Sequence, residues 1–153
     1  MTVLHETIET SLPIDEAFAY VADFANAQEW DPGVATADRL DSGPVGLGSR
    51  YRLGVRMGRR VAPMEYRISV FEPSTRVVLV GSGSGVSAVD EIRFERTASG
   101  TLVDYTADIR LGGVLRLIQP LLGRAFANLG RNAVEGMVRT LEARAASDLA
   151  GRP

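Results

Sequence analysis

The sequence predicts an α+β domain in which a curved antiparallel sheet of about seven strands wraps around one long C-terminal helix. Between residues 34 and 111, apolar and polar residues alternate with a period of two, which is typical of strands. Short glycine-containing turns separate these segments and favour antiparallel neighbours. After Gly112, apolar residues recur at steps of three and four as far as about Ala146, which predicts one long amphipathic helix.

The N-terminal residues predict one strand followed by two short helices. Residues 3–12 place Leu4 and Ile8 on one face and His5 on the other, so that His5 is expected to face solvent. Pro13 suits the first turn of a helix. A second short helix is expected over residues 24–29 and ends before Pro32.

The sequence also predicts the remaining strands, one hairpin connection and the limits of the last helix. The segment Gly81–Gly85 lacks the lysine of a phosphate-binding loop and is interpreted as a hairpin connection. Pro120 is expected either to kink the last helix or to mark its start, and residues 147–153 are expected to fray beyond a single domain of residues 1–146. Strands are expected over residues 34–40, 51–57, 64–70, 77–80, 88–95 and 103–111.

This architecture predicts a ligand cavity. One face of the sheet is apolar and needs a cover, and the last helix carries the long apolar stripe that can provide it. A helix of 30 residues spans roughly 45 Å, enough to cross a curved sheet. A bent sheet that grips one helix need not close completely, so a small molecule is expected between them.

Several short segments, taken in their order and spacing, resemble a known family. They are Leu12–Phe18, Asp23, Glu29–Val34, Gly43–Ser49 and Gly100–Tyr105. Together they resemble the START-like or SRPBCC superfamily with its helix-grip fold, and within it the bacterial polyketide cyclase/dehydrase and lipid-transport family. The resemblance covers essentially the whole chain. It implies the fold far more strongly than any reaction, because these are structural motifs.

Composition excludes several chemistries. The chain has no Cys and no Lys, which removes thiolate nucleophiles, Schiff bases and the P-loop lysine. Its single His rules out a His-rich metal site, so no metal and no cofactor are expected. A net charge of −2 does not favour nucleic acid, and no apolar run is long enough for stable membrane insertion. Residues 1–9 lack the apolar core of a signal peptide, which predicts a cytoplasmic protein. The all-arginine basic set suggests a bacterial source.

Strand and helix periodicity places a set of aromatic and apolar side chains on the inward face. The tyrosines are of particular interest, because a buried hydroxyl needs a partner that water or a ligand in a cavity can supply. Plain core packing, or a position at the rim of the sheet, is the alternative for each residue. The predicted ligand-binding residues are Tyr51, Tyr66, Asp90, Phe94, Tyr105, Leu122 and Phe126.

Asp90 is the one candidate catalytic residue, and no firm catalytic set accompanies it. It shares a strand face with Ile92 and Phe94, so its carboxyl could face an apolar cavity and act as a general acid or base. The alternative is that Asp90 lies near a strand end and reaches solvent or an Arg. We favour this alternative from the sequence, since charged residues are rarely buried unpaired.

Other polar residues receive structural interpretations. The hairpin cluster Arg50, Arg52, Arg56, Arg59 and Arg60 could bind an acidic partner or an anionic surface, but cross-strand pairing with Glu65, Glu91 or Glu95 is the preferred interpretation. Trp30 is interpreted as a packing anchor rather than as part of a pocket mouth. Asp23 and Asp31 are interpreted as turn and cap residues.

Three functional hypotheses follow. The first is a module that binds an apolar or aromatic small molecule, such as a lipid, polyketide or quinone-like compound, in the cavity between sheet and helix. The second, implied by the resemblance, is a polyketide cyclase or aromatase. The third is a partner-binding protein that uses the Arg hairpin, and a homodimer is also possible.

Overall fold

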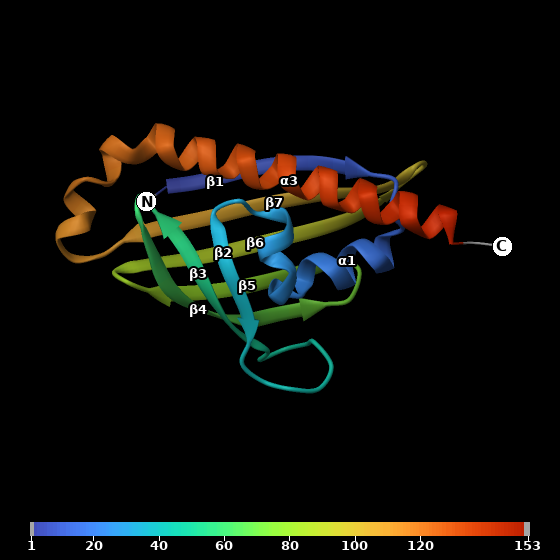
Figure 1. Cartoon of the computed structure of the whole chain (residues 1–153), viewed down its shortest axis with the longest axis horizontal. Coiled ribbons are helices and arrows are strands. Elements are labelled where there is room, and N and C mark those ends of the chain that lie inside the picture. Colours follow the sequence, from blue (N-terminus) through green and yellow to red (C-terminus); the bar gives the residue numbers. More distant parts are fainter. Residues whose placement is uncertain (1, 152–153) are drawn as a thin grey trace.

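The computed structural model describes residues 2–151 and confirms the helix-grip fold (Figure 1). Seven strands, two short α-helices and one long helix occur in the predicted order, and three 3₁₀ segments, which the sequence did not predict, lie beside them. Their bounds are β1 (Thr2–Thr10), α1 (Ile14–Ala22), η1 (Phe24–Asn26), α2 (Ala27–Trp30), β2 (Val34–Arg39), β3 (Arg50–Met57), β4 (Arg60–Glu72), β5 (Arg76–Gly83), β6 (Val86–Thr97), β7 (Gly100–Leu111), η2 (Gly113–Leu117), η3 (Gln119–Leu122) and α3 (Gly123–Ala150).

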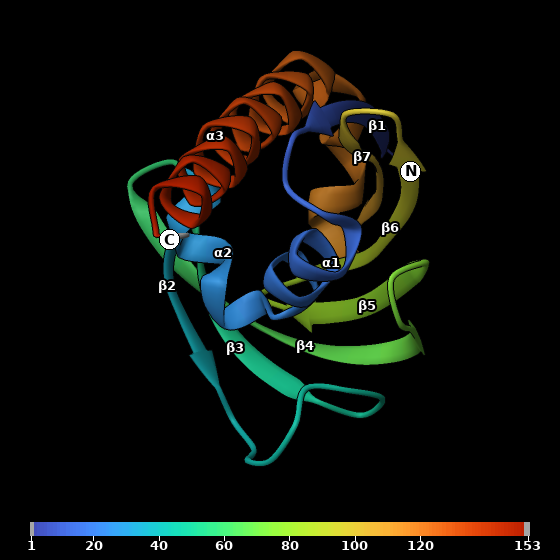
Figure 2. The same cartoon turned by 90° about the vertical axis from the view of Figure 1, so that its right-hand side faces the viewer.

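The seven strands form one antiparallel sheet in the order β1-β7-β6-β5-β4-β3-β2. Register shifts between Val34 and Thr36 in β2, and between Ile68 and Val70 in β4, mark irregularities that increase local bending. Viewed end on, the sheet curls around α3, α1 and α2 (Figure 2). The curl creates the concave face on which the site lies.

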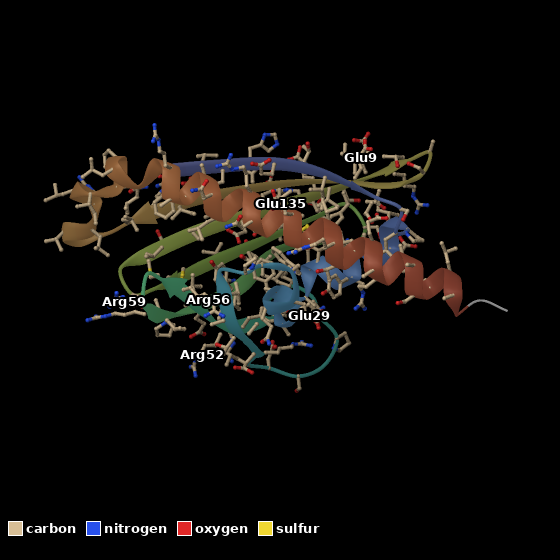
Figure 3. The ribbon with its side chains drawn as sticks, turned by 45° about the horizontal axis from the view of Figure 1, so that its top comes forward. Glu9, Glu29, Arg52, Arg56, Arg59 and Glu135 are labelled. Carbon is tan, nitrogen blue, oxygen red and sulfur yellow. The ribbon has the colours of Figure 1, made fainter. Side chains whose placement is uncertain are left out.

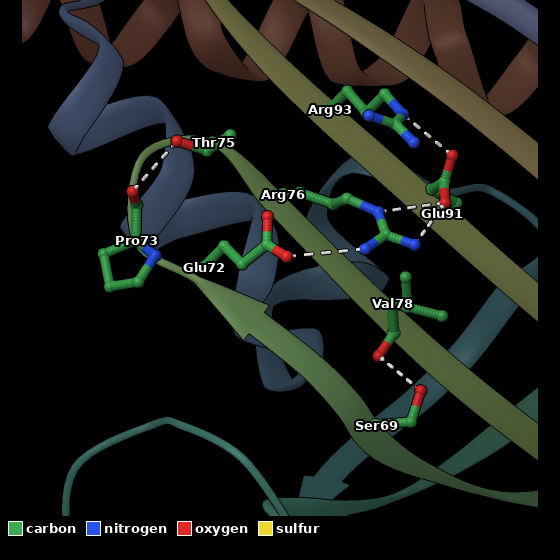
Figure 4. Close-up of polar contacts among 8 residues, drawn as sticks. All are labelled: Ser69, Glu72, Pro73, Thr75, Arg76, Val78, Glu91 and Arg93. Atoms are coloured by element: carbon green, nitrogen blue, oxygen red, sulfur yellow. Dashed lines mark hydrogen bonds and ion pairs between the residues drawn. The ribbon is translucent and has the colours of Figure 1, made fainter.

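The convex face of the sheet is polar, as the strand alternation predicts. Figure 4 shows the Glu91 carboxylate accepting hydrogen bonds from Arg76 Nη2 at 2.8 Å and from Arg93 Nε at 2.9 Å. The Arg76 hydrogen bond lowers the pKa of Glu91. His5 also faces outward, where its Nε2 lies 2.7 Å from Asp104 Oδ1. The convex face therefore carries polar and charged groups that lie in solvent, whereas the concave face is mainly apolar.

The last helix begins and ends later than the sequence predicts. Two 3₁₀ turns occupy residues 113–122, and α3 begins at Gly123 rather than at Leu115 or Pro120. Pro120 lacks an N–H and clashes with the preceding turn of an α-helix, so the chain takes tighter turns around it. At the other end α3 continues to Ala150, beyond the predicted end at about Ala146. Residues 152–153 lie outside the described part.

A close backbone contact holds α3 against the short helix α2. A Cβ atom at Gly136 would lie 1.9 Å from the carbonyl oxygen of Trp30, so only glycine permits this approach. Farther along α3, Glu142 accepts hydrogen bonds from the Ser11 amide at 2.8 Å and from its hydroxyl at 3.0 Å. These contacts fix the distance between α3 and the sheet and therefore the size of the space between them.

Candidate functional site

A cavity of about 170 Å³ lies between the concave face of the sheet and the first half of α3. Strands β1, β3, β4, β6 and β7, the residues around α2, and α3 all contribute to its wall. The wall is mainly apolar and includes Leu53, Met64, Ala88, Phe126 and Met137. The predicted gap between sheet and helix is therefore present in the structure.

Asp90 of β6 and Tyr105 of β7 form a hydrogen-bonded pair in the cavity wall. The Tyr105 hydroxyl donates to Asp90 Oδ2 at 2.7 Å, and Asp90 is only 7% exposed. No Arg forms an ion pair with Asp90 within residues 2–151. The preferred sequence interpretation, in which Asp90 reaches solvent or an Arg, is therefore wrong, because Asp90 lies within the covered part of β6 and finds a phenol partner.

Burial changes the protonation of this pair. It raises the pKa of Asp90 from 3.8 to about 7, an effect that the Tyr105 hydrogen bond opposes and the charge of Asp31 increases. Burial and the nearby Asp90 charge raise the pKa values of the Tyr66 and Tyr105 phenols. Near neutral pH, Asp90 is thus present in both protonation states and can donate or accept a hydrogen bond.

Asp31 is a cavity residue that the sequence interpretation missed. Its Oδ1 accepts a hydrogen bond from the Gly33 amide at 2.8 Å, as expected of a turn residue. The same side chain also lines the cavity, where burial raises its pKa. The Asp-Pro-Gly sequence predicts the turn, but it does not show that α3 will cover the turn and bury the carboxyl.

The predicted ligand-binding residues divide into two groups. Tyr66, Asp90, Tyr105 and Phe126 line the cavity. Tyr51, Phe94 and Leu122 lie outside its lining.

Neighbouring helices cover two of the three residues that lie outside the lining. Phe94 points inward but packs edge-on against Phe18 of α1, with ring centroids 5.1 Å apart. Tyr51 is fully buried beside Phe24 of η1, with ring centroids 6.4 Å apart. Leu122 is the last residue before α3, which begins at Gly123. The short N-terminal helices therefore fill one end of the concave face, and the cavity occupies the other.

Tyr66 owes its position to a glycine on the neighbouring strand. Gly81 of β5 is paired with Tyr66, and a Cβ at Gly81 would lie 2.4 Å from the Tyr66 ring. The ring can therefore lie flat over β5 beside the cavity. The predicted hairpin at Gly81–Gly85 is present, but β5 continues to Gly83 and the turn is confined to Ser84 and Gly85.

Trp30, the only tryptophan of the chain, both anchors α2 and lines the cavity. It is 2% exposed and its ring meets the Tyr105 ring edge-on, with centroids 6.1 Å apart. The two sequence interpretations of Trp30, packing anchor and pocket residue, therefore both describe its position.

The Arg hairpin is paired only in part. Arg50 lies 3.7 Å from Glu65, as the preferred interpretation expects, but Glu91 pairs with Arg76 and Arg93 instead. Arg56 lines the edge of the cavity, where its Nε donates to the Pro32 carbonyl oxygen at 3.2 Å. Arg59 forms no ion pair with any described residue, and Figure 3 shows it at the end of the molecule.

The described residues contain no cluster suited to a metal ion and no helix suited to crossing a membrane. Within residues 2–151, no three His, Cys, Asp or Glu side chains gather closely enough to hold a metal. No helix in that range is both long and apolar enough to span a bilayer. The titratable side chains in the cavity lining are Glu6, Asp31, Arg56, Tyr66, Asp90 and Tyr105.

The structure is therefore that of an α+β protein with a mainly apolar cavity between a concave sheet and a long helix. The family model described as "Polyketide cyclase / dehydrase and lipid transport" matches residues 1–146. The chain belongs to this family, which confirms the resemblance noted in the sequence. A search of curated protein sequences found no significant match.

Solved structures share the fold at low sequence identity. The Zhui aromatase/cyclase from Streptomyces sp. R1128 superposes with a TM-score of 0.73 at 13% identity, covering 94% of each chain. A START superfamily protein from Mycobacterium smegmatis gives 0.70 at 16% identity, covering 92% of this chain and 99% of the other. The di-domain aromatase/cyclase BexL gives 0.68 at 19% identity, covering 91% and 46%. At these identities the likeness establishes the fold alone.

Proposed function

We propose that the protein binds a neutral, mostly apolar small molecule of one or two rings in the cavity between its sheet and α3. The observation that carries this proposal is an apolar cavity whose wall contains the Asp90–Tyr105 pair. Apolar burial supplies most of the affinity, and a hydroxyl or carbonyl hydrogen-bonded to Asp90 orients the ligand. The expected cytoplasmic location and the possible homodimer stay predictions.

The volume of the cavity limits the size of the buried part. An engineered apolar cavity of about 150 Å³ holds one benzene ring, and this cavity measures about 170 Å³. A lipid or polyketide chain is therefore too large to be enclosed completely. We infer that any longer chain extends past Met57 and Leu129, two lining residues that are 37% and 38% exposed.

The charges around the cavity select against anions. Asp90 is buried and Asp31 is partly buried in the wall, and Arg56, the one Arg among the described lining residues, lies at the exposed edge. A ligand carboxylate near Asp90 would face like charge without a buried cation. Phenols, alcohols and quinones fit, because Asp90 accepts from a hydroxyl when ionised and donates to a carbonyl when protonated.

Calorimetric titration with 2-naphthol and 2-naphthoate tests this selection. We expect 2-naphthol to bind at least about tenfold more tightly than 2-naphthoate above pH 7. Ala88→Phe fills the cavity and should abolish naphthol binding. Val89→Phe is the matched control on the opposite, exposed face of β6 and should leave binding unchanged. Equal affinity for the two compounds, or retained binding in Ala88→Phe, would contradict the proposal.

Asp90 also supports a second candidate function, the cyclase or aromatase activity. A buried acid with a pKa of about 7 is matched to proton transfer at neutral pH. Asp90 could remove a proton from a bound poly-β-ketone chain whose folded conformation the cavity imposes.

Asp90→Asn separates this enzyme function from simple binding. We expect cyclisation of a synthetic poly-β-ketone to slow by roughly 10²- to 10⁴-fold in Asp90→Asn if Asp90 moves the proton. The Asn side chain can still accept from Tyr105, so 2-naphthol binding should remain. Unchanged cyclisation in the variant, or no cyclisation by the wild type, would leave binding alone as the function.

A further inference from the structure

The segment of residues 113–122, called here the leucine-rich segment, has an inverted burial pattern. Between Gly112 and Ala125, all of which the structure describes, the polar residue Gln119 is the only buried one. Its Nε2 donates to the Ile109 carbonyl at 2.9 Å, and its Oε1 accepts from the Leu111 amide at 3.2 Å. Gln119 therefore anchors the segment to the end of β7.

Four apolar side chains of this segment face outward, whereas Leu115 and Leu122 pack partly against the core. Val114 and Leu117 are each 80% exposed, Leu121 is 82% exposed and Ile118 is 43% exposed. In 3₁₀ turns, residues three apart lie on the same side, which gathers these side chains. Contiguous exposed apolar side chains of this kind mark an interaction surface.

In the sequence around the leucine-rich segment, the charged residues are all arginines. No Asp or Glu occurs between Asp108 and Glu135, whereas Arg116 and Arg124 lie in this interval. The β3–β4 hairpin is similar, with Arg59 and Arg60 in an interval free of carboxylates from Ser42 to Met64. These four arginines form no ion pair with any residue that the structure describes.

The leucine-rich segment and the hairpin lie at the same end of the molecule. Figure 1 shows the turns before α3 at the left, where the β3–β4 and β5–β6 hairpins also end, and Figure 3 labels Arg59 there. The Gly112 amide donates to the Gly85 carbonyl at 2.8 Å, which joins the segment to the β5–β6 turn. Met57, at the end of β3 just before this hairpin turn, and Leu129, in the first part of α3, are exposed apolar residues of the cavity lining.

We propose that this end of the molecule docks on an anionic lipid surface, with Val114, Leu117 and Leu121 entering the interface and the four arginines facing lipid phosphates. Exposed aliphatic side chains flanked by arginine are the composition of peripheral membrane contacts. A second copy of the chain is a poorer partner, because a twofold contact would place arginines against arginines without carboxylates between them. Docking would bring the cavity edge close to the bilayer.

Vesicle co-sedimentation tests the docking surface with the whole protein. We expect binding to vesicles of phosphatidylcholine with phosphatidylglycerol, weakening as salt is added, and little binding to phosphatidylcholine alone. Each of Arg116→Gln and Arg124→Gln should reduce binding about fivefold, since one arginine near an anionic surface contributes about that factor. Leu117→Ser with Leu121→Ser should reduce it further, and both side chains are exposed enough for folding to be unaffected.

Matched controls remove similar groups from the convex face of the sheet. Val80→Ser with Val89→Ser removes two exposed aliphatic side chains there, and Arg67→Gln removes one charge. These variants should bind vesicles as the wild type does. The proposal is overturned if the wild type ignores anionic vesicles at low salt or if the controls lose binding equally. It is also overturned if Leu117→Ser with Leu121→Ser abolishes self-association instead, which would assign the surface to a second copy. Because no cavity ligand is involved, failure here leaves the proposed function untouched.

Discussion

Replacing Asp90 with Asn is expected to stabilise the protein above pH 7 and to flatten its stability between about pH 4 and pH 7. The folded state raises the pKa of Asp90 from 3.8 to about 7, so it binds a proton over this interval that the unfolded chain releases. The stability contributed by protonated Asp90 is complete below pH 3.8 and is lost as the pH rises through about 7. The full difference corresponds to about 4 kcal/mol.

Urea unfolding of wild type and Asp90→Asn across this pH range measures the effect as the difference between the two proteins. Exposed carboxylates elsewhere contribute equally to both and cancel. Asp38→Asn, on the exposed side of β2, is the control and should follow the wild type. Parallel curves for Asp90→Asn and wild type would show that Asp90 is not buried as an isolated acid.

Substituting Gly136 with Ala is expected to destabilise the protein and to enlarge or distort the cavity. A Cβ there would lie 1.9 Å from the Trp30 carbonyl oxygen, which belongs to the backbone and cannot rotate away. Overpacking of this kind costs about 1–3 kcal/mol, and more than offsets the gain of up to about 1 kcal/mol in helix propensity. Thermal unfolding would record the loss, and 2-naphthol binding should fall because α3 moves away from α2.

Gly130→Ala provides the matched comparison on the same helix. Its Cβ would approach Leu4 Cδ1 at 3.3 Å, and that contact is with the flexible end of a side chain. We expect Gly130→Ala to be neutral or slightly stabilising, because helix propensity improves and Leu4 can adjust. If Gly136→Ala were as stable as Gly130→Ala, the close approach of α3 to Trp30 would not hold in solution.

Periodicity predicts most of the fold and part of the site. Alternation along β6 and β7 places Asp90 and Tyr105 on the concave face, and the stripe on the last helix predicts what covers them. These inferences succeed because a side chain on a strand can point only to one face or the other. The start of α3 was harder to predict, since the chain takes 3₁₀ turns around Pro120 before the helix begins at Gly123.

The alternation of side chains along a strand does not by itself show what packs against a residue on the inward face. Phe94 and Tyr66 both face inward, but α1 covers Phe94 whereas the cavity lies beside Tyr66. The burial of Asp90 without an Arg runs against a general tendency that holds for most carboxylates. The burial of Asp31 depends on the tertiary approach of α3, which leaves no local pattern in the sequence.

Native mass spectrometry of the protein purified from its own host, with extraction of any retained compound, tests the central claim most directly. The proposal predicts a neutral, ring-containing apolar compound at up to one per chain in the wild type and in Val89→Phe, and none in Ala88→Phe. A retained fatty acid or other anion, or the same compound in Ala88→Phe, would contradict the assignment of this cavity as a site for neutral ligands.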